Sequence, residues 1–224
     1  MALSRITVLI SGRGSNLGAL VAYARAGHVA GAVTQVISNR PDAAGLGIAR
    51  DAGIATSVVD HSNHETRAAF DDALAASVDA SEPDLIVLAG FMRVLRADFV
   101  RRHAGRIINV HPSLLPLYPG LHTHRRALAD GVRIHGCSVH YVTSDVDVGP
   151  IIAQGAIPVL PGDDETTLAT RVRAVEHRLL PAAVGWHCAR RLVIENGRVR
   201  VTEAATDADG VLLVPLPRSS MSIT

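Results

Sequence analysis

The chain has 224 residues, of which 48% are hydrophobic but only 3% aromatic, so its core must consist mainly of Ala, Val, Leu and Ile. Its formal net charge of +1 argues against nucleic acid or an anionic membrane as the main partner. No apolar run approaches the ~20 residues of a membrane-spanning helix, and the first residues run into a strand rather than a signal peptide. We therefore expect a soluble cytoplasmic protein with reduced thiols at Cys137 and Cys188.

Strands and helices alternate along the first half of the chain. The pattern predicts strands at 6–10, 33–38, 56–59, 84–89 and 107–111, with helices at 17–26, 43–52, 66–77 and 97–103. Strands that alternate with helices form parallel sheets with helices on both faces. We therefore predict an α/β fold with a doubly wound, mostly parallel sheet.

The pattern changes after position 111. It predicts a helix at 122–130, neighbouring strands at 135–143 and 151–158, and a long helix at 163–186. The pair Asn196-Gly197 indicates a hairpin between 192–194 and 198–201, and 211–214 would add an edge strand. We expect one domain, 1–202, with a mixed C-terminal part. Its N-terminal lobe would span about 1–105, its C-terminal lobe about 106–202, and a tail, 203–224, would follow.

The stretch from 106 to 120, R-I-I-N-V-H-P-S-L-L-P-L-Y-P-G, joins a buried strand to a rigid loop. Side chains alternate along a strand, so Asn109 and His111 would leave its carboxyl end on the same side. An amide can donate to a developing oxyanion, and an imidazole can carry a proton near neutral pH. The pair therefore suits chemistry at a carbonyl group, although two residues that satisfy backbone groups at a strand end remain the alternative.

The turn Gly12-Arg13-Gly14-Ser15-Asn16 lies between the first predicted strand and helix. Free N–H groups and the helix dipole attract an anion at such a place, and glycine lets a phosphate approach the backbone. A dinucleotide motif would need glycine where Leu17 stands, and the Gly-Lys-Ser/Thr of a triphosphate loop is missing. A single phosphate fits best, with an ordinary turn as the alternative.

Two carboxylates further along the chain are candidates for the same site. Asp147, in S-D-V-D-V-G-P, would orient an imidazole and favour its charged form, but Asp145 in the same loop is equally eligible from the sequence alone. Glu176, in the long helix, is either a site residue or a charge that faces solvent. The closest histidine pairs, at 61 and 64 and at 122 and 124, have no third ligand at a zinc spacing, so we expect no metal site.

Four stretches together resemble a known family: G-R-G-S-N, L-A-G-F-M-R-V-L, I-N-V-H-P-S-L-L-P-L-Y-P-G-L-H-T-H and D-V-D-V-G-P. In this order they are similar to the phosphoribosylglycinamide formyltransferases of purine synthesis. The resemblance implies that a formyl group passes from 10-formyltetrahydrofolate to the amine of glycinamide ribonucleotide by direct attack, through a tetrahedral intermediate and without a metal. It implies these two small molecules as partners, no nucleic acid or membrane, and a possible homodimer.

The site residues that the resemblance implies fall into three groups. Asn109, His111 and Asp147 match the catalytic trio. The phosphate and ribose of the substrate would be held by Gly14, Ser15, Asn16 and Glu176. The folate pocket, in the C-terminal lobe and at its border, would comprise Arg67 (near the glutamate tail), Phe91, Met92, Arg93, Val94, Leu95, Asn109, Thr143, Ser144, Asp145, Val146, Asp147 and Val148.

Three departures from the family pattern concern affinity rather than reaction type. Leu117 stands where lysine is common, Val148 where glycine often follows the aspartate, and Arg173 where a neutral polar residue is usual. The alternative activities are a 10-formyltetrahydrofolate hydrolase or another amine formyltransferase, whose members typically carry an additional domain that we do not expect here. A non-catalytic nucleotide-binding module is the alternative from a different class.

Overall fold

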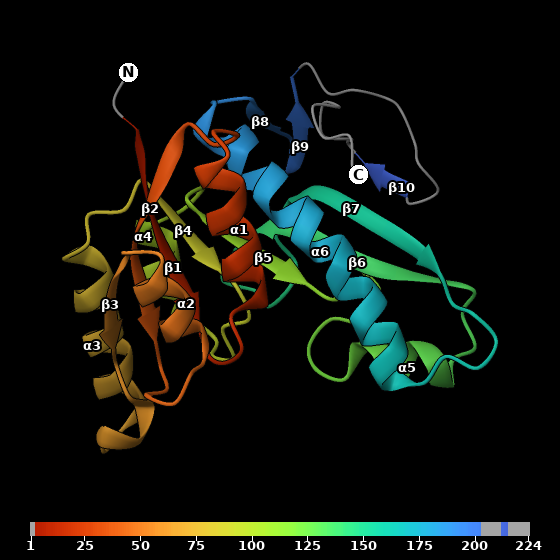
Figure 1. Ribbon diagram of the computed structural model, residues 1–224, viewed down its shortest axis with the longest axis horizontal. Helices are drawn as coiled ribbons and strands as arrows, with labels where there is room; N and C mark the ends of the chain where they lie inside the picture. The colour runs from red at the N-terminus through yellow and green to blue at the C-terminus, as the bar shows by residue number, and fades with distance from the viewer. Residues whose placement is uncertain (1–2, 203–211, 215–224) are drawn as a thin grey trace.

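A mixed sheet of eight strands runs through the part of the chain that this computed structural model describes, residues 3–202 and 212–214 (Figure 1). Its strands are β1 (Ser4–Ile10), β2 (Gly31–Ser38), β3 (Ala55–Val58), β4 (Leu85–Leu88), β5 (Ile107–His111), β6 (Ile134–Tyr141), β7 (Ile151–Pro158) and β10 (Leu212–Val214). They lie in the order β10-β7-β6-β5-β4-β1-β2-β3. Pairing is parallel from β3 to β5 and antiparallel from β5 to β10, which confirms the predicted mostly parallel α/β sheet.

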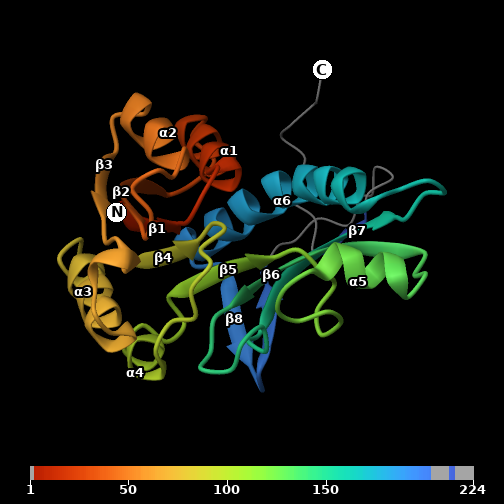
Figure 2. The ribbon, with the colours of Figure 1, turned by 90° about the horizontal axis from the view of Figure 1, so that it is seen from below.

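Helices cover both faces of the sheet (Figure 2). One face carries α1 (Ser15–Arg25), α2 (Gly45–Asp51) and α6 (Glu165–Cys188), and the other carries α3 (Arg67–Asp79) and α4 (Ala97–Arg102). Alternation along β1 explains the two cores, because Ile6, Val8 and Ile10 enter the cluster under α1 and α6 while Leu9 enters the cluster under α3 and α4. The helix α5 (Thr123–Ala129) lies beside α6, and β8 (Leu192–Glu195) and β9 (Arg198–Val201) form the predicted hairpin.

The predicted bounds differ from those of the structure by one or two residues at most ends. Capping explains two of these shifts, since Thr66 accepts a hydrogen bond from the Ala69 amide before α3 and Asp164 forms a capping box with Thr167 before α6. A 3-10 turn, η1 (His61–Asn63), was not predicted. The predicted strand at 211–214 is present at 212–214, while residue 211 and the rest of the predicted tail lie outside the described residues.

The carboxyl ends of the parallel strands place the candidate residues at one edge of the sheet. Ser11 follows β1, Gly90 follows shortly after β4, and His111 ends β5, and these three strands are neighbours in the sheet. Ligands of open α/β sheets bind at this edge. Within the described ranges, no helix combines the length and the apolar character needed to cross a lipid bilayer.

Candidate active site

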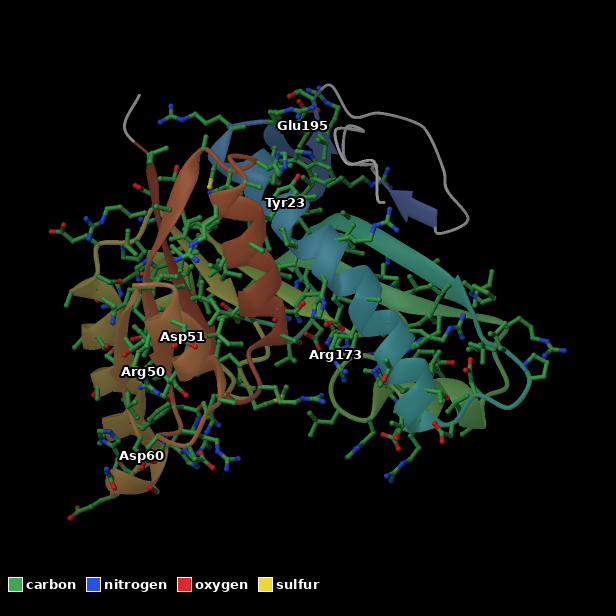
Figure 3. All side chains as sticks on the ribbon, in the orientation of Figure 1. Tyr23, Arg50, Asp51, Asp60, Arg173 and Glu195 are labelled. Carbon is green, nitrogen blue, oxygen red and sulfur yellow. The ribbon has the colours of Figure 1, made fainter. Side chains whose placement is uncertain are left out.

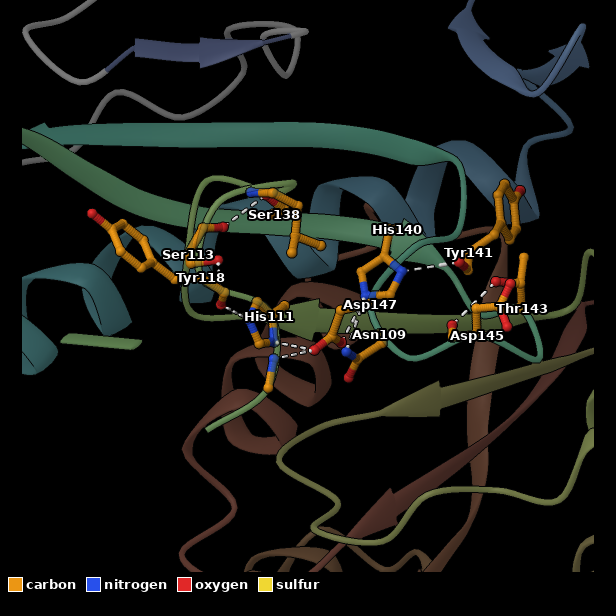
Figure 4. Close-up of polar contacts among 12 residues, drawn as sticks. Asn109, His111, Ser113, Tyr118, Ser138, His140, Tyr141, Thr143, Asp145 and Asp147 are labelled. Atoms are coloured by element: carbon orange, nitrogen blue, oxygen red, sulfur yellow. Dashed lines mark hydrogen bonds and ion pairs between the residues drawn. The ribbon is translucent and has the colours of Figure 1, made fainter. Parts of the chain in front are cut away.

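His111, the last residue of β5, is held by acceptors on both sides of its ring (Figure 4). Its Nε2 lies 2.9 Å from the carbonyl oxygen of Tyr118, and its Nδ1 lies 3.3 Å from Oδ2 of Asp147. A carbonyl can only accept, so Nε2 carries a proton and donates it to Tyr118. The loop that follows β5 and the Asp147 carboxylate thus orient a buried imidazole from two sides.

Of the two eligible carboxylates, Asp147 is the one that lies beside His111. Its Oδ2 accepts a hydrogen bond from the Gly120 amide at 2.9 Å, and its side chain is only 10% exposed. Its backbone adopts a left-handed φ of 57°, which turns the side chain into the site from a loop. Asp145 is exposed, and its carbonyl accepts a hydrogen bond from Thr143.

Asn109 is oriented by a residue that the sequence did not single out, His140 on β6. The two are direct partners across the antiparallel pair of β5 and β6, and Nδ2 of Asn109 lies 3.1 Å from Nε2 of His140. Burial lowers the pKa of His140, whose Nδ1 donates to the Tyr141 carbonyl at 2.9 Å, so its Nε2 can accept from Asn109. One N–H of Asn109 is therefore fixed, and the other stays available to an oxyanion.

The predicted phosphate turn leads directly into α1. Gly14 caps the helix with a left-handed φ of 75°, and a Cβ built on it would lie 2.5 Å from the Cα of Gly45. The N–H groups of the first turn of a helix have no partner within the helix. Ser15 makes no side-chain hydrogen bond to the described residues, so its hydroxyl is free for an anion.

The side chain of Asn16 connects the start of α1 to α6. Its Nδ2 donates to Oε2 of Glu176 at 2.8 Å across 160 residues of sequence, while its Oδ1 is buried with no partner in the described part of the chain. The second N–H of Nδ2 and the backbone N–H of Asn16 are therefore left for a phosphate. The buried Oδ1 can accept a further hydrogen bond from water or from a ligand.

Glu176 faces the site and not the solvent, so the solvent-facing alternative is wrong. It is buried, and burial raises its pKa, while the hydrogen bond from Asn16 and the charges of Arg173 and His111 oppose that shift. Arg173 lies on the side of α6 that faces α1 (Figure 3). Glu176 is therefore a buried carboxyl that is tied to the start of α1 through Asn16.

Most residues of the predicted folate pocket lie on two loops, 91–95 and 143–148, while Arg67 lies in α3 and Asn109 in β5. In the first loop, Phe91 and Leu95 are buried in the second core cluster, whereas Met92 and Val94 are exposed. Arg67, the first residue of α3, donates to the Val94 carbonyl at 3.0 Å, so it lies against this loop. Arg93 lies over the ring of Phe70, and the second loop exposes Thr143, Ser144, Val146 and Val148.

The histidine pairs considered for a metal have other partners. Nδ1 of His124 lies 3.2 Å from Nε2 of His135, and burial lowers the pKa of His135 to about 4. Nδ1 of His61 donates to the Asn39 carbonyl at 2.8 Å. Across residues 3–202, no group of three or more His, Cys, Asp or Glu side chains is arranged to hold a metal ion.

Known proteins are similar to this chain in sequence and in fold. The family described as Formyl transferase matches residues 4–184. Phosphoribosylglycinamide formyltransferase of Escherichia coli K12 is 46% identical over 210 residues, which cover 94% of this chain and 96% of that protein. Glycinamide ribonucleotide transformylase 1 of Symbiobacterium toebii superposes with a TM-score of 0.86 at 48% identity, covering 89% of this chain and 94% of the other.

A formyltetrahydrofolate deformylase of Pseudomonas putida shares the fold at a TM-score of 0.80, but it is 29% identical and only 70% of its chain is covered. The family match extends over most of the sequence, from β1 into α6, and therefore includes both strand ends that carry the candidate residues. This chain belongs to the formyl transferase family.

Proposed function

We propose that this protein transfers the formyl group of 10-formyltetrahydrofolate to the amine of glycinamide ribonucleotide. The observation that carries the proposal is the presence of two ordered arrangements at one edge of the sheet: the His111–Asp147 pair after β5, and the hydrogen bond of Asn16 to Glu176 at the start of α1, which follows β1. The first arrangement would catalyse formyl transfer and the second would bind the phosphate, and both lie at the same edge of the sheet. Relatives that match nearly their whole length are named for this reaction.

In the proposed reaction the amine attacks the formyl carbon, and negative charge develops on the formyl oxygen. The free N–H of Asn109 and the charged ring of His111 stabilise that oxygen. Losing a single donor of this kind typically lowers turnover ~10²–10³-fold. Asp147 keeps the ring charged and, through water, helps the proton of the amine reach the departing folate nitrogen.

The other residues position the two substrates. The N–H groups at the start of α1 and the Ser15 hydroxyl bind the phosphate, and Glu176 accepts hydrogen bonds from the ribose hydroxyls. The loop of Phe91 to Leu95 and the loop that carries Asp147 enclose the folate, with Arg67 near its glutamate tail. Binding energy from these remote groups holds the amine against the formyl carbon.

The test is to mix the purified protein with both substrates and to follow the folate absorbance together with the products. Formylated ribonucleotide in step with folate release supports the proposal. The resemblance to a deformylase makes a hydrolase the second candidate. Release of formate at the same rate with and without the ribonucleotide would establish that activity and contradict ours, and no reaction at all would favour a binding module.

A further inference from the structure

Ser11, the first residue after β1, makes hydrogen bonds to the segments that follow two other strands. Its amide donates to the Gly90 carbonyl at 3.1 Å, and its Oγ accepts from the Met92 amide at 2.8 Å. The same Oγ donates to Oδ1 of Asn39, which follows β2, at 2.6 Å. One buried hydroxyl thus joins the carboxyl ends of β1, β2 and β4.

Asn39 fixes the direction of that hydroxyl. It is almost fully buried, and its backbone carbonyl accepts a hydrogen bond from Nδ1 of His61, which holds the backbone at Asn39 in place. A serine hydroxyl has one hydrogen to donate. Because Ser11 donates that hydrogen to Asn39, the lone pairs of the Ser11 hydroxyl must face the Met92 amide. The positions of these three groups relative to one another are therefore fixed.

The two segments that Ser11 joins are those that would bind the two substrates. Gly12 follows it directly and opens the turn that leads to Ser15, while Met92 lies within the proposed folate loop. Met92 and Val94 are exposed, so the outer part of that loop has little packing of its own to fix its position. The hydroxyl of Ser11 is a direct hydrogen-bond tie between this part of the loop and the strand end before the phosphate turn.

We propose that Ser11, oriented by Asn39, is a positioning residue that sets the spacing between the bound ribonucleotide and the bound folate. The inference rests on the proposed function, because only a reaction between two bound substrates needs that spacing. Its signature is a loss of turnover without an equal loss of either affinity. Misplacing reacting groups by ~1 Å can lower a rate ~10²-fold even when the altered residue lies away from the chemistry.

The kinetic test compares Ser11→Ala with Ser38→Ala. Ser38, at the end of β2, is also buried, but among the described residues its hydroxyl bonds with the backbone of Arg40 alone, so its removal controls for general loosening of the fold. We expect Ser11→Ala to lower kcat ~10²-fold and to change both KM values less than ~3-fold, while Ser38→Ala stays near the parent. Asn39→Ala should give the same pattern more weakly, and it decides the matter if Ser11→Ala does not fold.

A second measurement does not depend on turnover. Inorganic phosphate is added to isotope-labelled protein, and the amide resonances of Ser15 and Met92 are followed by NMR. In the parent both should move, whereas in Ser11→Ala only Ser15 should move, because the connection through the hydroxyl is gone.

The outcomes separate the inference from the proposed function. A parent that is inactive with both substrates would sink the proposed function, and the inference with it. An active parent in which Ser11→Ala behaves like Ser38→Ala would sink the inference alone. A Met92 resonance that phosphate leaves unmoved in the parent, or moves equally in Ser11→Ala, would also overturn it.

Discussion

Replacing Glu176 by glutamine should make the protein more stable near neutral pH and worse at binding the ribonucleotide. Burial raises the pKa of Glu176, so ionising it inside the fold is unfavourable. A glutamine amide keeps an acceptor for Asn16 and adds N–H donors near the unpartnered Oδ1 of Asn16. Satisfying one buried polar group contributes ~1–3 kcal/mol, which in a chain of this size corresponds to several °C in Tm.

The pH dependence of this gain has a definite sign. A carboxyl whose pKa is raised in the fold binds its proton more tightly folded than unfolded, so its contribution to stability is present at low pH and is lost as pH rises through the folded pKa. Glutamine does not titrate. The advantage of Glu176→Gln should therefore be small below ~4, the ordinary carboxyl range, and should grow as the pH rises towards neutrality.

Thermal unfolding across this pH range tests the predicted gain in stability, and steady-state kinetics at one pH tests the predicted loss of affinity for the ribonucleotide. A charged acceptor forms stronger hydrogen bonds than a neutral amide, by ~1–1.5 kcal/mol, so the KM for the ribonucleotide should rise ~10-fold while the KM for the folate stays unchanged. A variant that is less stable than the parent at neutral pH, or an unchanged KM for the ribonucleotide, would refute this reasoning.

Three further substitutions test the rest of the site. Asn109→Ala should lower turnover ~10²–10³-fold with an unchanged circular dichroism spectrum; turnover within a few-fold of the parent would make Asn109 structural. Asp147→Asn should lower turnover more than ~10²-fold, because it removes the charge beside His111 and keeps the shape, whereas Asp145→Asn should stay near the parent; comparable losses in both variants would contradict the assignment. Arg173→Gln should raise the KM for the ribonucleotide a few-fold, mainly at low salt, as measured by titrating ionic strength; equal effects at all salt concentrations would argue against a role for its charge.

The order of helices and strands could be read from the sequence because hydrophobic periodicity is a local signal. Residues at the ends of strands could likewise be singled out, since the prolines that follow His111 and the glycine at Gly14 mark where the backbone must turn. The choice between Asp145 and Asp147 could not be made in this way. It depends on the left-handed backbone at Asp147 and on an amide from a loop 27 residues earlier.

What the sequence concealed are contacts between distant segments and contacts made by backbone atoms. His140 supports Asn109 through the register of β5 against β6, which pairs residues that are 31 positions apart in the sequence and so escapes a reading of local patterns. The carbonyl of Tyr118, which sets the protonated nitrogen of His111, is invisible to any reading of side-chain types. Pairing of Asn16 with Glu176 also depends on how α6 crosses α1.

The left-handed backbone at Asp147 restricts this position independently of chemistry. Glycine, asparagine and aspartate tolerate that conformation readily, while β-branched residues do not. In a library of all substitutions at this position, glycine and asparagine should therefore accumulate as folded but inactive protein, and valine or isoleucine should be depleted as protein. Asp147→Ala would mix the two effects. Substitutions at this one position thus test two requirements separately: protein yield tests the shape of the loop, and activity tests the charge beside the imidazole.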